Sequence, residues 1–231
     1  MSVNHRTGTS TSGNKTRMKY KAILLFGAPG SGKGTQGKIL GTIPNFYHFS
    51  CGEVFRNLRP DSELGRVFLE YSGHGQLVPD EPTIRLWRHH LEAAEHDDRF
   101  NPKTDLLVLD GIPRNVNQAK MLSGTIDVRV ILYLSCPDID KLVFRLQRRA
   151  LRENRLDDAN IGVIRKRLQT YETETAPVLN FYGEELVRKI DSTQSPINVL
   201  RDILDILAGI VSEDTAFTKR RTSKKPGKKR V

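Results

Sequence analysis

Short apolar runs alternate along the chain with longer segments in which apolar residues recur at helical spacing. The run YKAILLF over residues 20–26 is largely apolar and ends at a glycine, which is typical of a strand buried on both faces of a parallel sheet. Similar runs predict further strands, and the five expected strands cover residues 20–26, 46–49, 105–109, 128–134 and 186–190.

The segments between these runs have the spacing of amphipathic helices. Helices are expected over residues 33–40, 52–58, 63–71, 82–95, 138–151, 161–171 and 197–211, and Pro177 is expected to break the helical pattern that precedes it. Strands that alternate with helices predict an α/β fold with a parallel sheet and helices on both faces. Residues 50–80 contain no strand pattern and are interpreted as a small helical insertion.

A glycine-rich sequence follows the first predicted strand directly. Residues 27–33, GAPGSGK, match the GxxxxGK pattern of a phosphate-binding loop between a strand and a helix. Glycines let the backbone turn so that its N–H groups point at phosphate oxygens, and the helix N-terminus adds positive potential. The expected ligands of a nucleoside triphosphate are Gly30, Ser31, Gly32, Lys33, Gly34 and Thr35. The expected fold is therefore P-loop NTPase-like.

The end of this loop departs from the general motif. Gly34 stands where a Ser or Thr usually binds magnesium, and the first hydroxyl belongs to Thr35. Direct ligation of Mg²⁺ by Thr35 is accordingly less secure, although Thr35 stays the candidate.

Two arginines follow the next two strands in the chain. Arg56 lies beyond the second strand and Arg114 beyond the third. Each alone is typical of a solvated surface charge, but the carboxyl ends of parallel strands meet at one edge, where ligands bind. Two guanidinium groups at that edge favour a second phosphate group.

Four sequences together resemble adenylate kinase and its nucleoside monophosphate kinase relatives: GAPGSGKGTQ, HFSCGEVFR, GQLVPDE and DGIPRNVNQA. The resemblance covers about residues 20–210 and implies the strand order 2-3-1-4-5, with residues 50–80 as the monophosphate-binding domain. It implies that Arg56 and Arg114 clamp the monophosphate beside Gly111 and that Gln118 faces the adenine. The backbone around Gln76 and Val78 would line the same base, and Asp110 would hold water in the Mg²⁺ shell.

Arginines crowd the segment after the fourth strand. Fixed cations stabilise a phosphoryl group during transfer, so the cluster has a chemical reason beyond a basic helix face. The resemblance implies that Arg145 stacks on the adenine of ATP and that Arg149, Arg155 and Arg167 wrap the phosphates. Arg165 is an alternative to Arg167.

The same resemblance implies that Asp157 and Asp158 orient these arginines, although Asp158 could instead cap the next helix. Arg149 and Arg155 are close in sequence and no cysteine lies between them, which indicates a short lid, residues 149–156, without zinc.

The residues at the expected monophosphate site are compatible with two kinds of acceptor, AMP or a pyrimidine nucleotide (UMP or CMP). Cys51 stands where adenylate kinases usually carry Thr and UMP/CMP kinases Ala, and Ile112 replaces a usual Phe. Gln118 favours adenine, because the pyrimidine-specific relatives tend to carry Asn there. We expect reversible, Mg²⁺-dependent transfer from ATP to AMP, which gives two ADP, with a UMP/CMP kinase as the alternative.

The net charge of +10 is concentrated at the chain ends. Residues 219–230 and the first nineteen residues hold twelve Lys and Arg, so the segment between them carries a small negative charge. We expect a leader at 1–18, one folded domain at 19–212 and a disordered basic tail at 213–231, which could bind nucleic acid or anionic membrane weakly. The alternative from another class is therefore a nucleotide-sensing or RNA-binding protein.

The two cysteines, Cys51 and Cys136, form no CxxC pair and indicate a reducing compartment. Without an apolar signal sequence, we expect a cytoplasmic location, and we expect a monomer.

Overall fold

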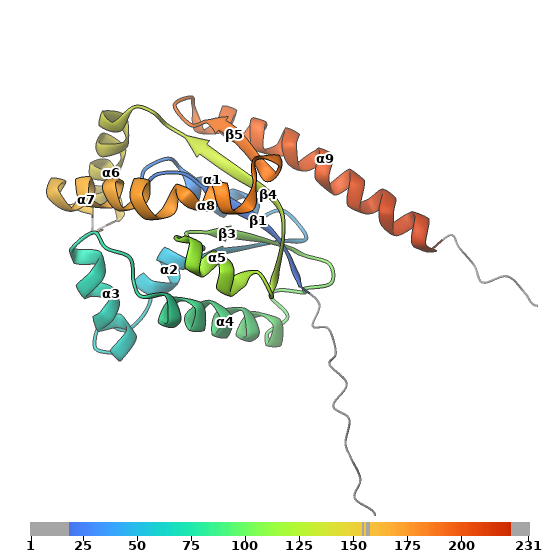
Figure 1. Ribbon diagram of the computed structural model, residues 1–231, viewed down its shortest axis with the longest axis horizontal. Helices are drawn as coiled ribbons and strands as arrows, with labels where there is room; N and C mark the ends of the chain where they lie inside the picture. Colours follow the sequence, from blue (N-terminus) through green and yellow to red (C-terminus); the bar gives the residue numbers. More distant parts are fainter. Residues whose placement is uncertain (1–18, 154, 156–157, 223–231) are drawn as a thin grey trace, which may run out of the picture.

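A five-stranded parallel sheet forms the centre of the computed structural model, which describes residues 19–153, 155 and 158–222 (Figure 1). The strands are β1 (Tyr20–Phe26), β2 (Phe46–Ser50), β3 (Leu106–Asp110), β4 (Ile126–Ser135) and β5 (Val187–Asp191). Their order is β2-β3-β1-β4-β5, and every neighbouring pair is parallel. The predicted fold class and strand order are confirmed.

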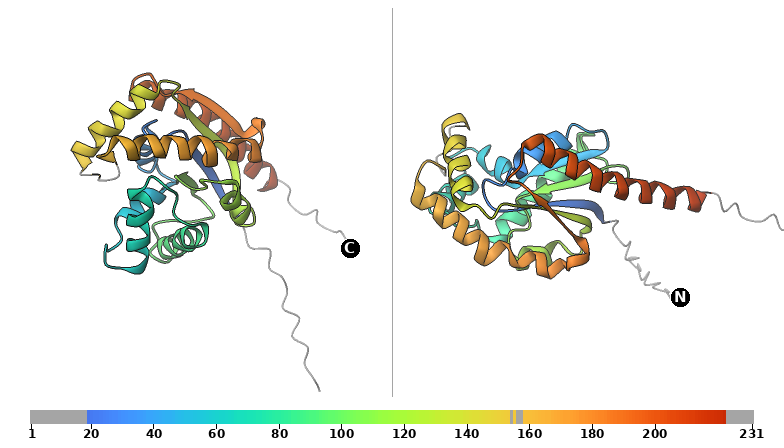
Figure 2. Two further views of the ribbon diagram at one scale, coloured as in Figure 1. Left: turned by 60° about the vertical axis from the view of Figure 1, so that its left-hand side comes forward. Right: turned by 90° about the horizontal axis from the view of Figure 1, so that it is seen from above.

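Helices cover both faces of this sheet because alternate strand residues point to opposite sides. Ala22 and Leu24 of β1 join Trp87 in one buried cluster, whereas Ile23 and Leu25 join a second cluster. The first cluster includes side chains of α4 (Asp80–His96), α5 (Val116–Leu122) and α8 (Pro177–Tyr182). The second includes side chains of α1 (Lys33–Leu40) and α9 (Pro196–Thr222). The right-hand view of Figure 2 shows α9 and α8 on opposite sides of the sheet.

Two pairs of helices flank the carboxyl edge of the sheet (Figure 1). One pair is α2 (Cys51–Arg56) and α3 (Glu63–Gly73), which are joined by the stacked rings of Phe55 and Phe68, 5.3 Å apart. The other is α6 (Ile139–Glu153) and α7 (Ile161–Thr170), and Leu142 and Ile164 of this pair pack in one cluster with Ala28 of the glycine-rich loop. The second pair therefore borders the segment that follows β1.

The expected break at Pro177 is wrong. The chain continues from α7 through a π-helical turn, Tyr171–Thr175, directly into α8, where Pro177 is the first residue. The N–H of Ala176 reaches back to the carbonyl of Tyr171 at 2.8 Å. A proline in the first position of a helix removes no hydrogen bond that the helix needs, so it starts a new helix here. A short 3₁₀ turn, Glu184–Leu186, then leads into β5.

Two further helices differ from the prediction. The sequence pattern missed α5, a short helix with a polar start that Asn115 caps by accepting a hydrogen bond from the N–H of Gln118 at 2.8 Å. α9 continues to Thr222, past the predicted end at residue 211, so the tail boundary at 213 falls inside a helix. No Gly or Pro interrupts residues 210–222, and Glu, Ala, Lys and Arg favour helix there.

The predicted leader, residues 1–18, and the end of the predicted tail, residues 223–231, lie outside the described residues. Within the described part of the chain, none of the helices has the length and apolar character needed to span a membrane.

The requirement for glycine at position 27, in the sharp turn after β1, can be tested by substitution. We expect Gly27→Ala to lower the free energy of unfolding by about 3 kcal/mol, because φ is +143° and a Cβ would lie 2.5 Å from the carbonyl oxygen of Leu134. Urea denaturation measures this loss. Gly124→Ala is the matched control, since a Cβ there meets nothing within 4 Å, and equal midpoints for the two variants would contradict the expectation.

Candidate functional site

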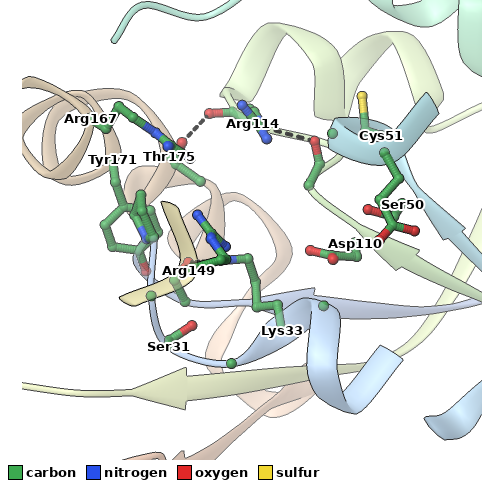
Figure 3. A pocket seen from close by; sticks show the side chains of 18 of the residues that line it. Ser31, Lys33, Ser50, Cys51, Asp110, Arg114, Arg149, Arg167, Tyr171 and Thr175 are labelled. Atoms are coloured by element: carbon green, nitrogen blue, oxygen red, sulfur yellow. Dashed lines mark hydrogen bonds between the residues drawn. The ribbon is translucent and has the colours of Figure 1, made fainter. Parts of the chain in front are cut away.

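A cavity of about 580 Å³ lies where the carboxyl ends of β1, β2 and β3 meet the flanking helices. Every site residue predicted from the sequence lines it: Gly30, Ser31, Gly32, Lys33, Gly34, Thr35, Cys51, Arg56, Gln76, Val78, Asp110, Gly111, Arg114, Gln118, Arg145, Arg149, Arg155 and Arg167. The close view in Figure 3 shows how several of these side chains converge from different elements. The structure thus brings the predicted residues together in one space.

The glycine-rich loop leaves β1 and turns tightly before α1. Gly30 and Gly32 have φ values of +86° and +101°, which L-residues with side chains rarely adopt. The ammonium of Lys33 folds back and donates hydrogen bonds to the carbonyls of Gly27 at 2.6 Å and Ala28 at 3.1 Å. The loop therefore holds a cation at its centre.

The electrostatic surroundings of Lys33 are unusual for a lysine. Burial lowers the pKa of Lys33 to about 8, and the carboxylate of Asp110 opposes this shift. The nearby guanidinium groups of Arg114, Arg149 and Arg167 contribute to the same lowering. A ligand with several negative charges would relieve this repulsion, as a phosphate chain would.

Arg114 is held at the end of β3 by backbone and side-chain contacts. Its Nε donates to the carbonyl of Gly111 at 2.9 Å, and the hydroxyl of Thr175 donates to the carbonyl of Arg114 at 2.7 Å (Figure 3). Arg56 lies on α2 across the same cavity, where a Cβ at Gly52 would stand 3.1 Å from its guanidinium. Small residues at 52 and 111 thus leave room for both guanidinium groups.

Asp158 organises the arginines of the lid segment. Arg149 donates from Nε to Asp158 Oδ2 at 2.7 Å, and Arg167 pairs with Oδ1 of the same carboxylate. Arg155 Nε lies 4.0 Å from Oδ2. Asp158 is fully buried, so its single charge is shared among several guanidinium groups and leaves an excess of positive charge at the cavity.

The structure confirms that Asp158 pairs with arginines. The alternative of a helix cap is wrong, because Asn160 caps α7 by accepting from the N–H groups of Gly162 and Val163. The predicted partner Asp157 lies outside the described residues.

Arg165 and Arg167 lie in different places in the structure. Arg167 lines the main cavity, whereas Arg165 is exposed and lines a separate hollow beside Cys136 and Glu172. Residues two positions apart on a helix point to different sides, so only Arg167 reaches the main cavity.

Arg145 lies on α6 near the opening of the glycine-rich loop. Its Nη2 donates to the carbonyl of Ser192 at 2.8 Å, and its Nη1 approaches the carbonyl of Gly30 at 3.5 Å. These contacts place a flat guanidinium beside the loop, where it can pack against a base.

Several residues of the site were not predicted from the sequence. Tyr171 and Thr175 come from the π-helical turn and line the same cavity as Arg149 and Arg167 (Figure 3). Burial raises the pKa of Tyr171, so it stays neutral. Ser192 holds Arg145 from the far end of the chain. No local sequence motif predicts that these three residues belong to the site, because their contacts join segments that are distant in the sequence.

Cys51 does not act as a nucleophile in this environment. Its thiol is buried, and this burial raises its pKa to about 11. A protonated thiol is a weak hydrogen-bonding group and a poor nucleophile, so Cys51 shapes the cavity wall.

Asp110 and Thr35, the two residues expected near Mg²⁺, both line the cavity. Asp110 is a nearly buried carboxylate, and a Cβ at Gly34 would lie 3.6 Å from its Oδ2, which places the carboxylate beside the start of α1. The hydroxyl of Thr35 lines the same region. Among the described residues no group of three metal-binding side chains occurs, and Mg²⁺ commonly relies on one carboxylate together with substrate phosphates.

The fold and this site define a phosphotransferase of the P-loop class with positive groups for more than one phosphate chain. The sequence profile described as Adenylate kinase matches residues 25–187. An adenylate kinase of Thermobifida fusca is 39% identical and covers 74% of this chain and 89% of its own.

Two further relatives show the range of the similarity. An adenylate kinase of a Cyanothece strain is 36% identical, over 81% of this chain and 96% of its own. A UMP-CMP kinase of Bos taurus is 33% identical, over 82% and 97%. The chain belongs to the adenylate kinase family, whose members are nucleoside monophosphate kinases.

The distinction between the two arginines of α7 can be measured directly. We expect Arg167→Ala to lower kcat about 100-fold or more, because it removes a fixed positive charge from the cavity. Arg165→Ala is the matched control and should keep kcat within about twofold, since Arg165 faces the other hollow. Steady-state phosphotransfer assays decide the matter, and equal losses in both variants would contradict the assignment.

The lowered pKa of Lys33 predicts a pH dependence. Below about pH 8 the free enzyme carries a charged Lys33, and above it the charge is lost. We expect kcat/KM for the nucleoside triphosphate, which reports the free enzyme, to fall above about pH 8. Bound phosphates raise the pKa of Lys33, so kcat should stay level to a higher pH.

Affinity for a nucleoside monophosphate alone is the control, because that site does not use Lys33. A kcat/KM profile that is flat to pH 10 would exclude this role for Lys33.

Proposed function

We propose that this protein catalyses the reversible, Mg²⁺-dependent transfer of the terminal phosphoryl group of ATP to AMP, which gives two ADP. One observation carries the proposal. The loop around Lys33 and the strand-end arginine Arg114 face the same cavity, and Asp158 holds Arg149 and Arg167 beside them. A triphosphate and a monophosphate bound at these groups would bring their phosphates together.

The chemistry then follows from position and charge. The loop backbone and Lys33 would hold the triphosphate, while Arg56 and Arg114 would hold the monophosphate. Arg149, Arg155 and Arg167 would surround the transferring group and stabilise the charge on its oxygens without acting as acids or bases. The accepting oxygen of a monophosphate is already anionic, so no general base is required.

Magnesium fits this arrangement as a companion of ATP. It would be held by phosphate oxygens, with Asp110 acting through water and Thr35 nearby, and it would neutralise phosphate charge.

The amide of Gln118 favours AMP over UMP. Its Oε1 accepts from the N–H of Arg114 at 2.8 Å, and its Nε2 donates to Asp80 at 2.8 Å. One N–H and one oxygen lone pair stay available to a base. Adenine places its N6 donor beside a ring acceptor, which complements an amide, whereas uracil carries a carbonyl there. Cytosine shares the adenine pattern, so a UMP/CMP kinase, and CMP as its substrate, is the second candidate.

A nucleotide-sensing or RNA-binding role is less well supported, because the cavity retains a full set of cationic groups for transfer. A monomeric state, a cytoplasmic location and an anionic partner for the basic C-terminus are further proposals that rest on composition alone.

A panel of monophosphates tests the proposed substrate. With MgATP as donor and AMP, CMP, UMP and GMP as acceptors, we expect the highest kcat/KM with AMP, measured by ADP formation in a coupled assay. Arg114→Ala, which removes the fixed cation at the end of β3, should lower kcat/KM about 100-fold. Fastest turnover with UMP, or unchanged turnover in Arg114→Ala, would refute the proposal.

A further inference from the structure

Asp80 lies behind the base-facing residue Gln118, at the start of α4 and outside the cavity lining. Its Oδ1 accepts hydrogen bonds from Asn115 Nδ2 and Gln118 Nε2, each at 2.8 Å. Its Oδ2 accepts from Asn117 Nδ2 at 2.7 Å. A single carboxylate thus receives the amide groups of three residues from the first turn of α5 and its cap.

The direction of each of these hydrogen bonds is fixed by chemistry. A backbone N–H only donates, so the oxygen of Gln118 must face the N–H of Arg114, and the oxygen of Asn115 must face the N–H of Gln118. An ionised carboxylate only accepts, so both NH₂ groups must face Asp80. Neither amide can turn over without placing donor against donor and acceptor against acceptor.

Asp80 is ionised at neutral pH. Partial burial alone would raise its pKa, but the hydrogen bonds from Asn117, Asn115 and Gln118 hold the pKa below its usual value. The carboxylate therefore persists as an acceptor wherever the enzyme is folded near neutral pH.

We propose that Asp80 is a positioning residue that determines base specificity, because it fixes which end of the buried Gln118 amide is NH₂ and which is oxygen. This inference rests on the proposed transfer to AMP. An amide held in this direction accepts a base with a donor beside an acceptor, such as adenine, and rejects a base with a carbonyl at that position. The rejected class includes hypoxanthine, which has nearly the same size as adenine.

This specificity comes mainly from the cost of leaving polar groups of the wrong base and of Gln118 without hydrogen-bond partners, and less from attraction to the right base. A hypoxanthine carbonyl would face the fixed oxygen of Gln118, and the 1% exposed side chain leaves no water to relieve the contact. Without Asp80, only the N–H of Arg114 would restrain the amide. The side chain could then swing or turn over to suit either base.

The experiment compares AMP with inosine 5′-monophosphate (IMP) as acceptors in the full-length enzyme. We expect Asp80→Ala to lower the AMP-to-IMP ratio of kcat/KM about tenfold or more. Asp80→Asn keeps an oxygen for Gln118 and should retain most of the wild-type ratio. Glu81→Ala is the matched control, because Glu81 is an exposed neighbour in the same helical turn, and it should leave the ratio unchanged.

A role limited to stability gives a different result. The ratio compares two substrates on the same folded molecules, so partial unfolding cancels. If Asp80→Ala does not fold, Asp80→Leu, which also lacks an acceptor but is bulkier, replaces it. A ratio within about twofold of wild type in a folded Asp80 variant without an acceptor would overturn the inference.

The experiment also distinguishes a failure of the proposed AMP recognition from a failure of the proposed role of Asp80. A wild-type enzyme that does not prefer AMP over IMP, or a Gln118→Leu variant that keeps the wild-type ratio, refutes base recognition by Gln118 and the inference with it. A wild type that prefers AMP, together with a Gln118→Leu variant that loses the preference and an Asp80→Ala variant that keeps it, refutes the role of Asp80 alone.

Discussion

Repulsion between cations that share one cavity is the constraint on which the rest of this structure depends. Burial lowers the pKa of Lys33 to about 8, and three nearby arginines add to this lowering against the opposing carboxylate of Asp110. Two buried carboxylates offset part of this repulsion: Asp110 lies near Lys33, and Asp158 pairs with the arginines. Their charge is too small to balance the cations, so the cavity is prepared for polyanionic ligands before any ligand binds.

The sheet brings these groups together from distant parts of the chain. The connection after β1 runs to β2 on one side of the sheet, whereas the connection after β3 crosses to β4 on the other side, and this reversal opens a crevice at the carboxyl ends of β1 and β3. The loop after β1, the helix after β2 and the turn after β3 all open into that crevice. The lid arginines reach it because α6 and α7 pack on the loop through Leu142 and Ile164.

The sequence predicts the parts of the site that depend on local chemistry. The phosphate loop is recognisable because its glycines, lysine and flanking strand and helix are contiguous, and the strands are recognisable as short apolar runs. The pairing of Asp158 with arginines nearby in the sequence was predicted, but the orienting contacts between distant residues were not. Thr175 bonds to Arg114 across 61 positions, and Gln118 bonds to Asp80 across 38.

The spacing of apolar residues also did not predict where some helices begin and end. Pro177 was expected to break a helical pattern, but it is the first residue of α8, which directly follows a π-helical turn. That turn carries Tyr171 and Thr175 into the cavity wall, so an irregularity that the pattern could not reveal belongs to the site.

The central claim is that one cavity passes a phosphoryl group between two nucleotides. The reverse reaction tests it most directly, because it needs only ADP and Mg²⁺. Phosphorus NMR of the enzyme with MgADP alone should show ATP and AMP appearing in equal amounts, with no inorganic phosphate. Release of inorganic phosphate without matching ATP, or ADP that stays unchanged, would contradict the account.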